Sequence, residues 1–233
     1  AVNQLLGAAF GSSGERCMAL SVAVAVGDDA GDALVSKMKV AMAGLKVGPY
    51  SDPDNDFGPV ITREHQQKII DHINHAEQQS AEIVVDGRFP KIAGYERGFY
   101  IGGTLIDRVT PDMDSYHAEI FGPVLQVVRV QSMQAAMDLI DAHEYGNGTC
   151  IFTRDGEAAR YFSDHINVGM VGINIPLPVP VAYHSFGGWK RSLFADHQPY
   201  APDPVRFYTK RKTITQRWPS AGIREGVLFS MPS

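Results

Sequence analysis

The chain has 233 residues, of which 44% are hydrophobic and 20% charged, and its 21 basic and 26 acidic side chains give a net charge of −5. This composition excludes a disordered chain and supplies enough apolar residues for a sizeable core. The acidic balance argues against nucleic acid as a partner of the whole chain, and prolines interrupt the longest uncharged stretch, residues 168–183, so we expect no membrane span.

Cysteine usage favours a reducing compartment. Only Cys17 and Cys150 are present, too few for a disulfide framework, which is typical of a bacterial cytoplasm or a mitochondrial matrix. The first residues contain no basic region, so we expect no signal peptide. The chain also starts without Met, and we therefore expect it to begin inside a longer protein.

Strands and helices are predicted to alternate along most of the chain. The first half predicts a helix at 3–11, a strand at 19–26, a helix from Asp28 or Asp29 to about 46, a helix capped by Thr62, and strands at 82–85 and 99–105. The second half predicts a strand at 123–130, a helix from Ser132 to about 143, a strand at 149–153, a helix from Asp155 to 167 and a strand at 169–174. This order predicts an α/β fold with a largely parallel sheet flanked by helices.

The end of the chain has a different character. Prolines at 199, 202 and 204 separate residues 1–198, the predicted α/β domain, from residues 199–233, a linker and tail. Within the tail, residues 205–218 mix β-branched and aromatic residues with lysine and arginine and contain no acid. Such a stretch fits an exposed edge strand, with a nucleic-acid contact as the alternative.

Cys17 is the candidate nucleophile. It lies between a short helix and a strand predicted to be buried, at a sheet edge where ligand clefts of α/β proteins form. Arg16 precedes it, and a cation beside a thiol favours the reactive thiolate. The alternative is a structural cysteine, the interpretation that we prefer for Cys150 in its apolar strand.

Three segments in this order carry a resemblance to a known family. They are residues 10–19 (FGSSGERCMA), 119–125 (EIFGPVL) and 185–192 (SFGGWKRS), and they resemble the aldehyde dehydrogenase superfamily. Residues 15–20, 178–185 and 206–218 are similar to its CoA-acylating branch, the methylmalonate-semialdehyde dehydrogenases. The resemblance implies that this chain is the C-terminal catalytic portion, that residues 205–218 form an oligomerisation strand, and that the full-length enzyme is a homo-oligomer, expected to be a tetramer.

The resemblance also assigns site residues. Cys17 would attack the aldehyde and carry the acyl group as a thioester that coenzyme A intercepts. Arg16 would pair with the substrate carboxylate, as a bidentate guanidinium can. Glu119 would accept hydrogen bonds from the ribose hydroxyls of NAD, and Phe121 would lie beside the nicotinamide ribose. Phe186 matches a tunnel-lining aromatic residue but could equally serve in packing.

Other parts of such an enzyme are not expected in this chain. It has no glycine-rich turn between a strand and a helix, so we expect the N-terminal NAD-binding domain to be absent and the isolated chain to be inactive. The spacing of its eight histidines predicts no metal site.

The function implied is oxidation of methylmalonate or malonate semialdehyde to propionyl-CoA or acetyl-CoA with loss of CO2, using NAD and coenzyme A. A small semialdehyde is thus the expected partner, with neither nucleic acid nor membrane. The alternatives are a non-acylating aldehyde dehydrogenase and a non-catalytic oligomeric α/β module.

Overall fold

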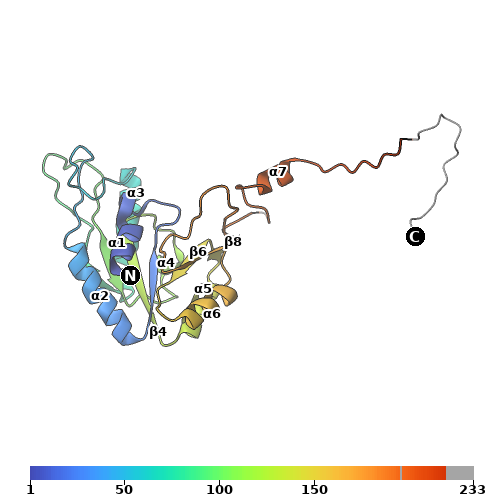
Figure 1. Cartoon of the computed structure of the whole chain (residues 1–233). Coiled ribbons are helices and arrows are strands. Elements are labelled where there is room, and N and C mark those ends of the chain that lie inside the picture. Colours follow the sequence, from blue (N-terminus) through green and yellow to red (C-terminus); the bar gives the residue numbers. More distant parts are fainter. Residues whose placement is uncertain (195, 219–233) are drawn as a thin grey trace.

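A four-stranded sheet forms the centre of the protein, which a computed structural model describes for residues 1–194 and 196–218 (Figure 1). Its order is β1 (Val22–Val26), β4 (Val124–Val130), β3 (Thr104–Asp107) and β2 (Glu82–Val85). β4 runs parallel to both β1 and β3, and only β2 is antiparallel to its neighbour. The predicted α/β fold with a largely parallel sheet is therefore confirmed.

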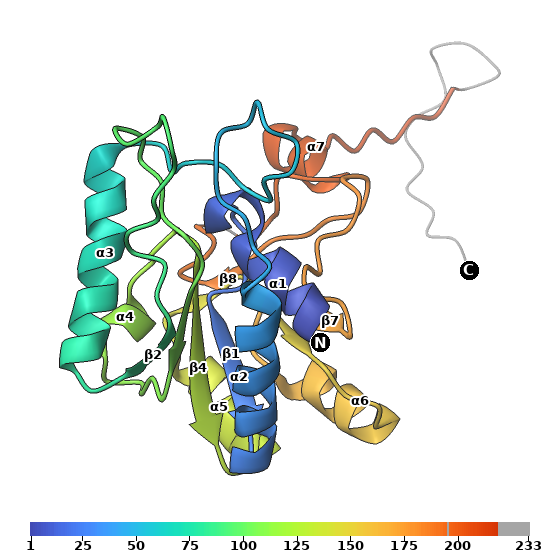
Figure 2. The same ribbon diagram turned by 90° about the vertical axis from the view of Figure 1, so that its left-hand side faces the viewer.

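Helices cover both faces of this sheet (Figure 2). On one face, α1 (Val2–Phe10) and α2 (Asp28–Met42) pack on one set of strand residues. That set comprises Ala23, Ala25, Leu105, Leu125 and Val127. On the other face, α3 (Arg63–Gln78) and α5 (Met133–Ala142) pack on the alternate residues, among them Ile106, Val124 and Val128. Because successive strand side chains point to opposite faces, a strand buried on both sides needs apolar residues at nearly every position.

A smaller group of elements follows the central sheet. β6 (Gly148–Ile151) pairs in parallel with β7 (Met170–Ile173), and β5 (Tyr145–Gly146) pairs antiparallel with β8 (Trp189–Lys190). α5 and α6 (Gly156–His165) share a small apolar cluster, which is built on Met137, Phe162, Ile166 and Val168. Two further short helices are η1 (Gly11–Gly14) and α4 (Asp114–His117). In the described part of the chain, no helix is long and apolar enough to cross a membrane.

Three of the predicted helix caps are confirmed. The side chains of Thr62, Ser132 and Asp155 each accept a hydrogen bond from a backbone N–H in the first turn of the helix that follows. The predicted cap at Asp28 or Asp29 is wrong, because α2 begins one residue earlier, with Gly27 at the N-cap and no side-chain cap. Both acids lie in the first turn, where their charge is favourable beside the positive end of the helix dipole.

Three strand predictions differ from the structure. Of the strand predicted at 19–26, only residues 22–26 form β1. Residues 99–103 are not part of β3, which begins at Thr104. Just before it, the backbones of Gly87 and Gly102 meet, and a β-carbon at residue 87 would lie 2.2 Å from the Gly102 carbonyl oxygen. At the end of the chain, residues 205–208 belong to α7 (Asp203–Tyr208), whose second residue is proline, and no strand is found among residues 209–218. This segment extends away from the main body (Figure 1). Its pairing with a neighbouring subunit stays a prediction, and residues 219–233 lie outside the described part.

A buried ion pair fastens β4 to the end of β3. Arg129 donates two hydrogen bonds to the Asp107 carboxylate, at 3.1 and 2.7 Å, and one to Asp32 of α2, at 2.7 Å. The Asp107 and Arg129 side chains are only 3% and 10% exposed. The hydrogen bonds that Arg129 donates to Asp107 and Asp32 raise the pKa of its guanidinium.

Removing the buried acid should therefore destabilise the fold far more than removing the exposed one. We expect Asp107→Ala to lower the free energy of unfolding by about 3 kcal/mol, since it leaves the Arg129 charge without its main partner. Asp32→Ala is the matched control, because the Asp32 side chain is 68% exposed, and it should cost less than about 1 kcal/mol. Urea unfolding of both variants measures the difference, and equal losses would contradict the role of the Asp107–Arg129 pair.

Candidate active site

The loop that carries Cys17 is unusually constrained. We call residues 11–19 the cysteine loop. Ser12, Ser13 and Gly14 all have positive φ angles, of 53°, 57° and 69°. Such left-handed backbone costs about 1–2 kcal/mol for a residue with a β-carbon. The Ser13 hydroxyl donates a 2.8 Å hydrogen bond to the Gly58 carbonyl oxygen and so holds the loop on the body of the protein.

Cys17 lies at the tip of this loop. The Ala19 N–H donates to the Arg16 carbonyl oxygen at 3.0 Å, and this closes a turn with Cys17 at its second position. The Cys17 side chain is exposed as a result. Asn147, from the turn between β5 and β6, approaches the loop from the other side, with its Nδ2 atom 3.4 Å from the Cys17 carbonyl oxygen.

Arg16 points back toward α1. Its Nη2 atom donates to the carbonyl oxygens of Gly7 and Ala8 at 2.6 and 3.1 Å, at the end of the helix where a cation is favoured. Its Nε atom is buried and has no hydrogen-bond partner among the described residues. The guanidinium thus has one nitrogen bound to backbone and one buried donor left over.

A second loop, residues 118–123, lies directly against the cysteine loop. A β-carbon at Gly14 would stand 2.1 Å from the Gly122 carbonyl oxygen, so the two backbones meet with no room for a side chain. Phe121 is 37% exposed and has a φ of 54°. Glu119 is exposed and makes no ion pair or side-chain hydrogen bond with any residue that the structure describes. Two of the three predicted segments therefore meet, with Cys17 on one and Glu119 and Phe121 on the other.

The direction of the strands explains why these loops meet. The cysteine loop leads into β1 and the second loop leads into β4, and these strands are parallel neighbours with Val22 opposite Gln126. Both loops consequently lie at the amino ends of their strands. Cys17 thus lies at an end of the sheet, but at the amino ends of the strands, whereas the ligand cleft expected for it from open α/β sheets lies at the carboxyl ends.

The third predicted segment, residues 185–192, is linked to the cysteine loop through Asn147. A β-carbon at Gly188 would lie 3.1 Å from the Asn147 Oδ1 atom, while Asn147 Nδ2 is 3.0 Å from the Met18 sulfur. Phe186 of this segment stacks on Tyr200, with ring centroids 4.2 Å apart and an interplanar angle of 11°. Phe186 is thus engaged in packing, one of the two roles left open for it.

The structure also joins two residues that the sequence did not single out as a pair. His65, in the first turn of α3, has its Nε2 atom 2.7 Å from the Phe121 carbonyl oxygen and 3.5 Å from Glu15 Oε1. Burial raises the pKa of the Glu15 carboxyl, and His65 and the Ile61 backbone amide partly offset this rise. No group of three or more potential metal ligands occurs in the described ranges.

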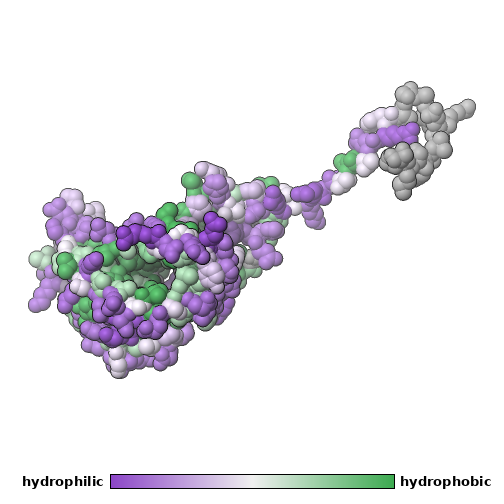
Figure 3. Space-filling view, turned by 60° about the horizontal axis from the view of Figure 1, so that its bottom comes forward, coloured by the Kyte–Doolittle hydropathy of each residue, from purple (hydrophilic) through white to green (hydrophobic). Residues whose placement is uncertain are grey.

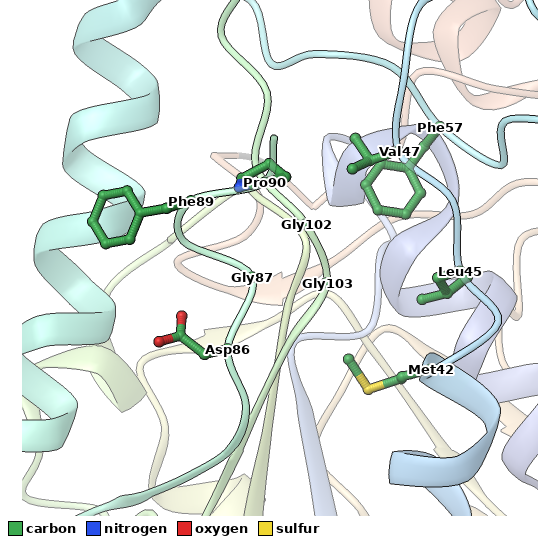
Figure 4. A pocket seen from close by; sticks show the side chains of 10 residues that line it. All are labelled: Met42, Leu45, Val47, Phe57, Asp86, Gly87, Phe89, Pro90, Gly102 and Gly103. Carbon is green, nitrogen blue, oxygen red and sulfur yellow. The ribbon is translucent and has the colours of Figure 1, made fainter. Parts of the chain in front are cut away.

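One pocket lies apart from this site. It has a volume of about 210 Å³ and sits between the end of α2 and the turns around Gly87 and Gly102 (Figure 4). None of Cys17, Arg16, Glu119 and Phe121 lines it. Six apolar side chains and three glycines line it, with Asp86 as the one ionisable side chain.

The fold and the site together define an α/β domain with an exposed cysteine on a strained loop. The sequence model of the aldehyde dehydrogenase family matches residues 1–214, and the chain belongs to this family. It is 60% identical to a malonate-semialdehyde dehydrogenase of Pseudomonas aeruginosa over all of its 233 residues, which are 47% of that protein.

Solved structures of related proteins support the same family. The chain superimposes on a methylmalonate-semialdehyde dehydrogenase of Oceanimonas doudoroffii with a TM-score of 0.92 and 81% identity, covering 96% of this chain and 46% of the other. A Sinorhizobium meliloti crystal structure complexed with NAD has a TM-score of 0.91 and 54% identity, covering 94% of this chain and 45% of that one. The chain thus spans about half the length of the relatives it matches.

The two cysteines should differ in reactivity. Cys17 is exposed, whereas burial raises the pKa of the Cys150 thiol to about 11. Near neutral pH we expect iodoacetamide to alkylate Cys17 at least about tenfold faster, since the thiolate is the reacting form and Cys150 reaches it only in strong base. Mass spectrometry of the peptides measures both rates in one sample. Faster alkylation of Cys150 would contradict the assignment of Cys17 as the accessible thiol.

Proposed function

We propose that this chain provides the cysteine-bearing catalytic part of an NAD-dependent, CoA-acylating dehydrogenase of methylmalonate or malonate semialdehyde. The observation that carries the proposal is the contact between the cysteine loop and the second loop, because it brings the Cys17 turn beside the segment with Glu119 and Phe121. The likeness to the Pseudomonas and Oceanimonas enzymes supports the substrate class.

The proposed chemistry begins at the Cys17 thiolate. Its sulfur attacks the aldehyde carbon and forms a thiohemiacetal, whose oxidation to a thioester releases a hydride. NAD, when bound, supplies the acceptor for that hydride. The C–C bond to the substrate carboxylate then breaks, CO2 leaves, and the electron pair left on the α-carbon takes up a proton from water. The thiol of coenzyme A gives up its proton and takes the acyl group, which returns Cys17 to the thiolate. The exposed position of Cys17 suits this role, since both the aldehyde and the coenzyme A thiol must reach it.

Arg16 is proposed to bind the substrate carboxylate. The Nη1 atom supports this role, because it makes no hydrogen bond with any residue that the structure describes and is left to donate to a carboxylate oxygen, whereas Nη2 is already engaged with α1. The bonds from Nη2 to α1 hold the guanidinium in place beforehand, which lowers the entropy lost on binding.

Glu119 and Phe121 are proposed to contact the ribose next to the nicotinamide. A carboxylate free of other partners can accept hydrogen bonds from two neighbouring hydroxyls, and the exposed Glu119 side chain meets that condition among the described residues. Phe121 offers part of its ring at the surface. The Sinorhizobium structure that contains NAD supports this choice of cofactor.

The remaining parts of the enzyme are proposed from the same likeness. Residues 1–198 would be the catalytic domain, residues 199–233 would serve in oligomerisation, and a separate dinucleotide-binding part would hold the rest of NAD. Figure 3 shows hydrophobic residues gathered in a hollow of the main body, with hydrophilic residues around it. Such a surface is suited to packing against another part of the enzyme or another subunit.

The direct test is an assay of the complete protein that carries this chain, with malonate semialdehyde, NAD and coenzyme A. We expect NADH and acetyl-CoA to form together, no activity in Cys17→Ala, and retained activity in Cys150→Ala. The 233-residue chain alone should give no turnover, because Glu119 and Phe121 can hold only one part of the cofactor. NADH formation that does not depend on coenzyme A would favour the non-acylating enzyme. A complete protein without activity would favour the non-catalytic module.

The role of Arg16 predicts a change in substrate preference. In the complete protein, Arg16→Leu should lower kcat/KM for malonate semialdehyde by about 10- to 150-fold, the effect of losing about 1.5–3 kcal/mol of charged hydrogen bonding. Propionaldehyde, which has no carboxylate, should lose far less. Arg154→Leu is the control, since Arg154 is exposed in the loop before α6. Equal losses for both substrates would show that Arg16 serves only to hold α1.

A further inference from the structure

Three separate parts of the chain meet at the imidazole of His65. The ring comes from α3, the Phe121 carbonyl from the second loop and the Glu15 carboxylate from the cysteine loop. The His65 and Phe121 rings also lie near each other, with centroids 6.4 Å apart. The His65 and Glu15 side chains are only 22% and 10% exposed, so the cluster is largely shielded from water.

The start of α3 fixes where the imidazole can lie. Thr62 caps the helix by accepting from the His65 backbone N–H at 3.1 Å, which makes His65 the third residue of the first turn. At the next residue, Gln66 donates to the Tyr100 carbonyl oxygen at 2.5 Å. His65 thus stands on a rigid element, whereas both of its partners stand on loops.

Hydrogen-bond chemistry assigns the proton. A carbonyl oxygen can only accept, so the Nε2 atom that is 2.7 Å from the Phe121 oxygen must carry a hydrogen. Glu15 Oε1, 3.5 Å from the same nitrogen, has no hydrogen-bond partner among the described residues and attracts that polar N–H. The carboxylate therefore favours the tautomer that holds Phe121.

We propose that His65 is a positioning residue that holds the second loop against the cysteine loop through its bond to the Phe121 carbonyl, with Glu15 as the group that orients its proton. The expected effect of His65 on NAD binding rests on the proposed function, whereas its effect on the position of the loop does not. Phe121 needs such support, because its left-handed backbone persists only where the surroundings enforce it. Without the imidazole, the loop can leave the position that presents Glu119 and Phe121.

Hydrogen–deuterium exchange of the 233-residue chain tests the loop directly. We expect His65→Leu to speed exchange in a peptide covering residues 116–122 by about 3- to 10-fold, the range for losing one hydrogen bond that resists local opening. His65→Gln should restore the slow exchange, since its side-chain amide can donate from a similar place. His75→Leu is the control, because His75 is exposed on the same helix. Unchanged exchange in His65→Leu, or an equal increase in every peptide, would overturn the proposal.

Kinetics of the complete protein separate this proposal from the function on which it rests. We expect His65→Leu to raise the KM for NAD by about 3- to 10-fold with a smaller change in kcat, and His65→Gln to restore it. Faster loop exchange with an unchanged KM in an active enzyme would overturn the effect of His65 on NAD binding, while the hold of His65 on the loop and the proposed function would both stand. An unmodified protein that shows no NAD-dependent activity would overturn the proposed function, while the exchange data would still decide whether His65 holds the loop.

Discussion

Gly14 lies so close to Gly122 that a β-carbon at residue 14 would stand 2.1 Å from the Gly122 carbonyl oxygen. Only glycine fits there, both for this distance and for its φ of 69°. The contact couples the two loops, so that a shift of one changes the surface offered by the other. It exists because β1 and β4 are parallel neighbours, which brings the segments preceding them to the same end of the sheet. The arrangement of Cys17 relative to Glu119 and Phe121 thus follows from the sheet topology.

Most of the fold could be predicted because its signals are local. The strands in the centre of the sheet are buried on both faces and consist of nearly continuous apolar residues, and the caps at Thr62, Ser132 and Asp155 are short-range hydrogen bonds. The failures concern contacts and elements that leave no local signal. β3 begins only at Thr104, next to the place where Gly87 and Gly102 meet, and these glycines are 15 positions apart in the sequence. β5 and β8 have two residues each, too few to show any periodicity.

The candidate site residues can be named from the sequence, but their contacts cannot. The segments around Cys17 and Glu119 stand out in the sequence because they resemble a family. Nothing nearby in the sequence indicates that Glu15 meets His65, since an ion pair between a loop and a helix 50 residues away leaves no periodic pattern. The orientation of Arg16 was hidden for a similar reason, because it depends on where the last carbonyls of α1 end in space.

The three non-glycine residues with left-handed backbone around this contact, Ser12, Ser13 and Phe121, show how the protein maintains it. Each conformation is unfavourable alone, so neighbouring groups must enforce it. Ser13 donates a hydrogen bond to Gly58, and the Phe121 carbonyl accepts one from His65. Both partners belong to the body of the protein rather than to either loop. The stability that the core provides therefore maintains a strained pair of loops in one arrangement. A binding or catalytic site benefits from this, because a group already held in place loses little entropy when a ligand arrives.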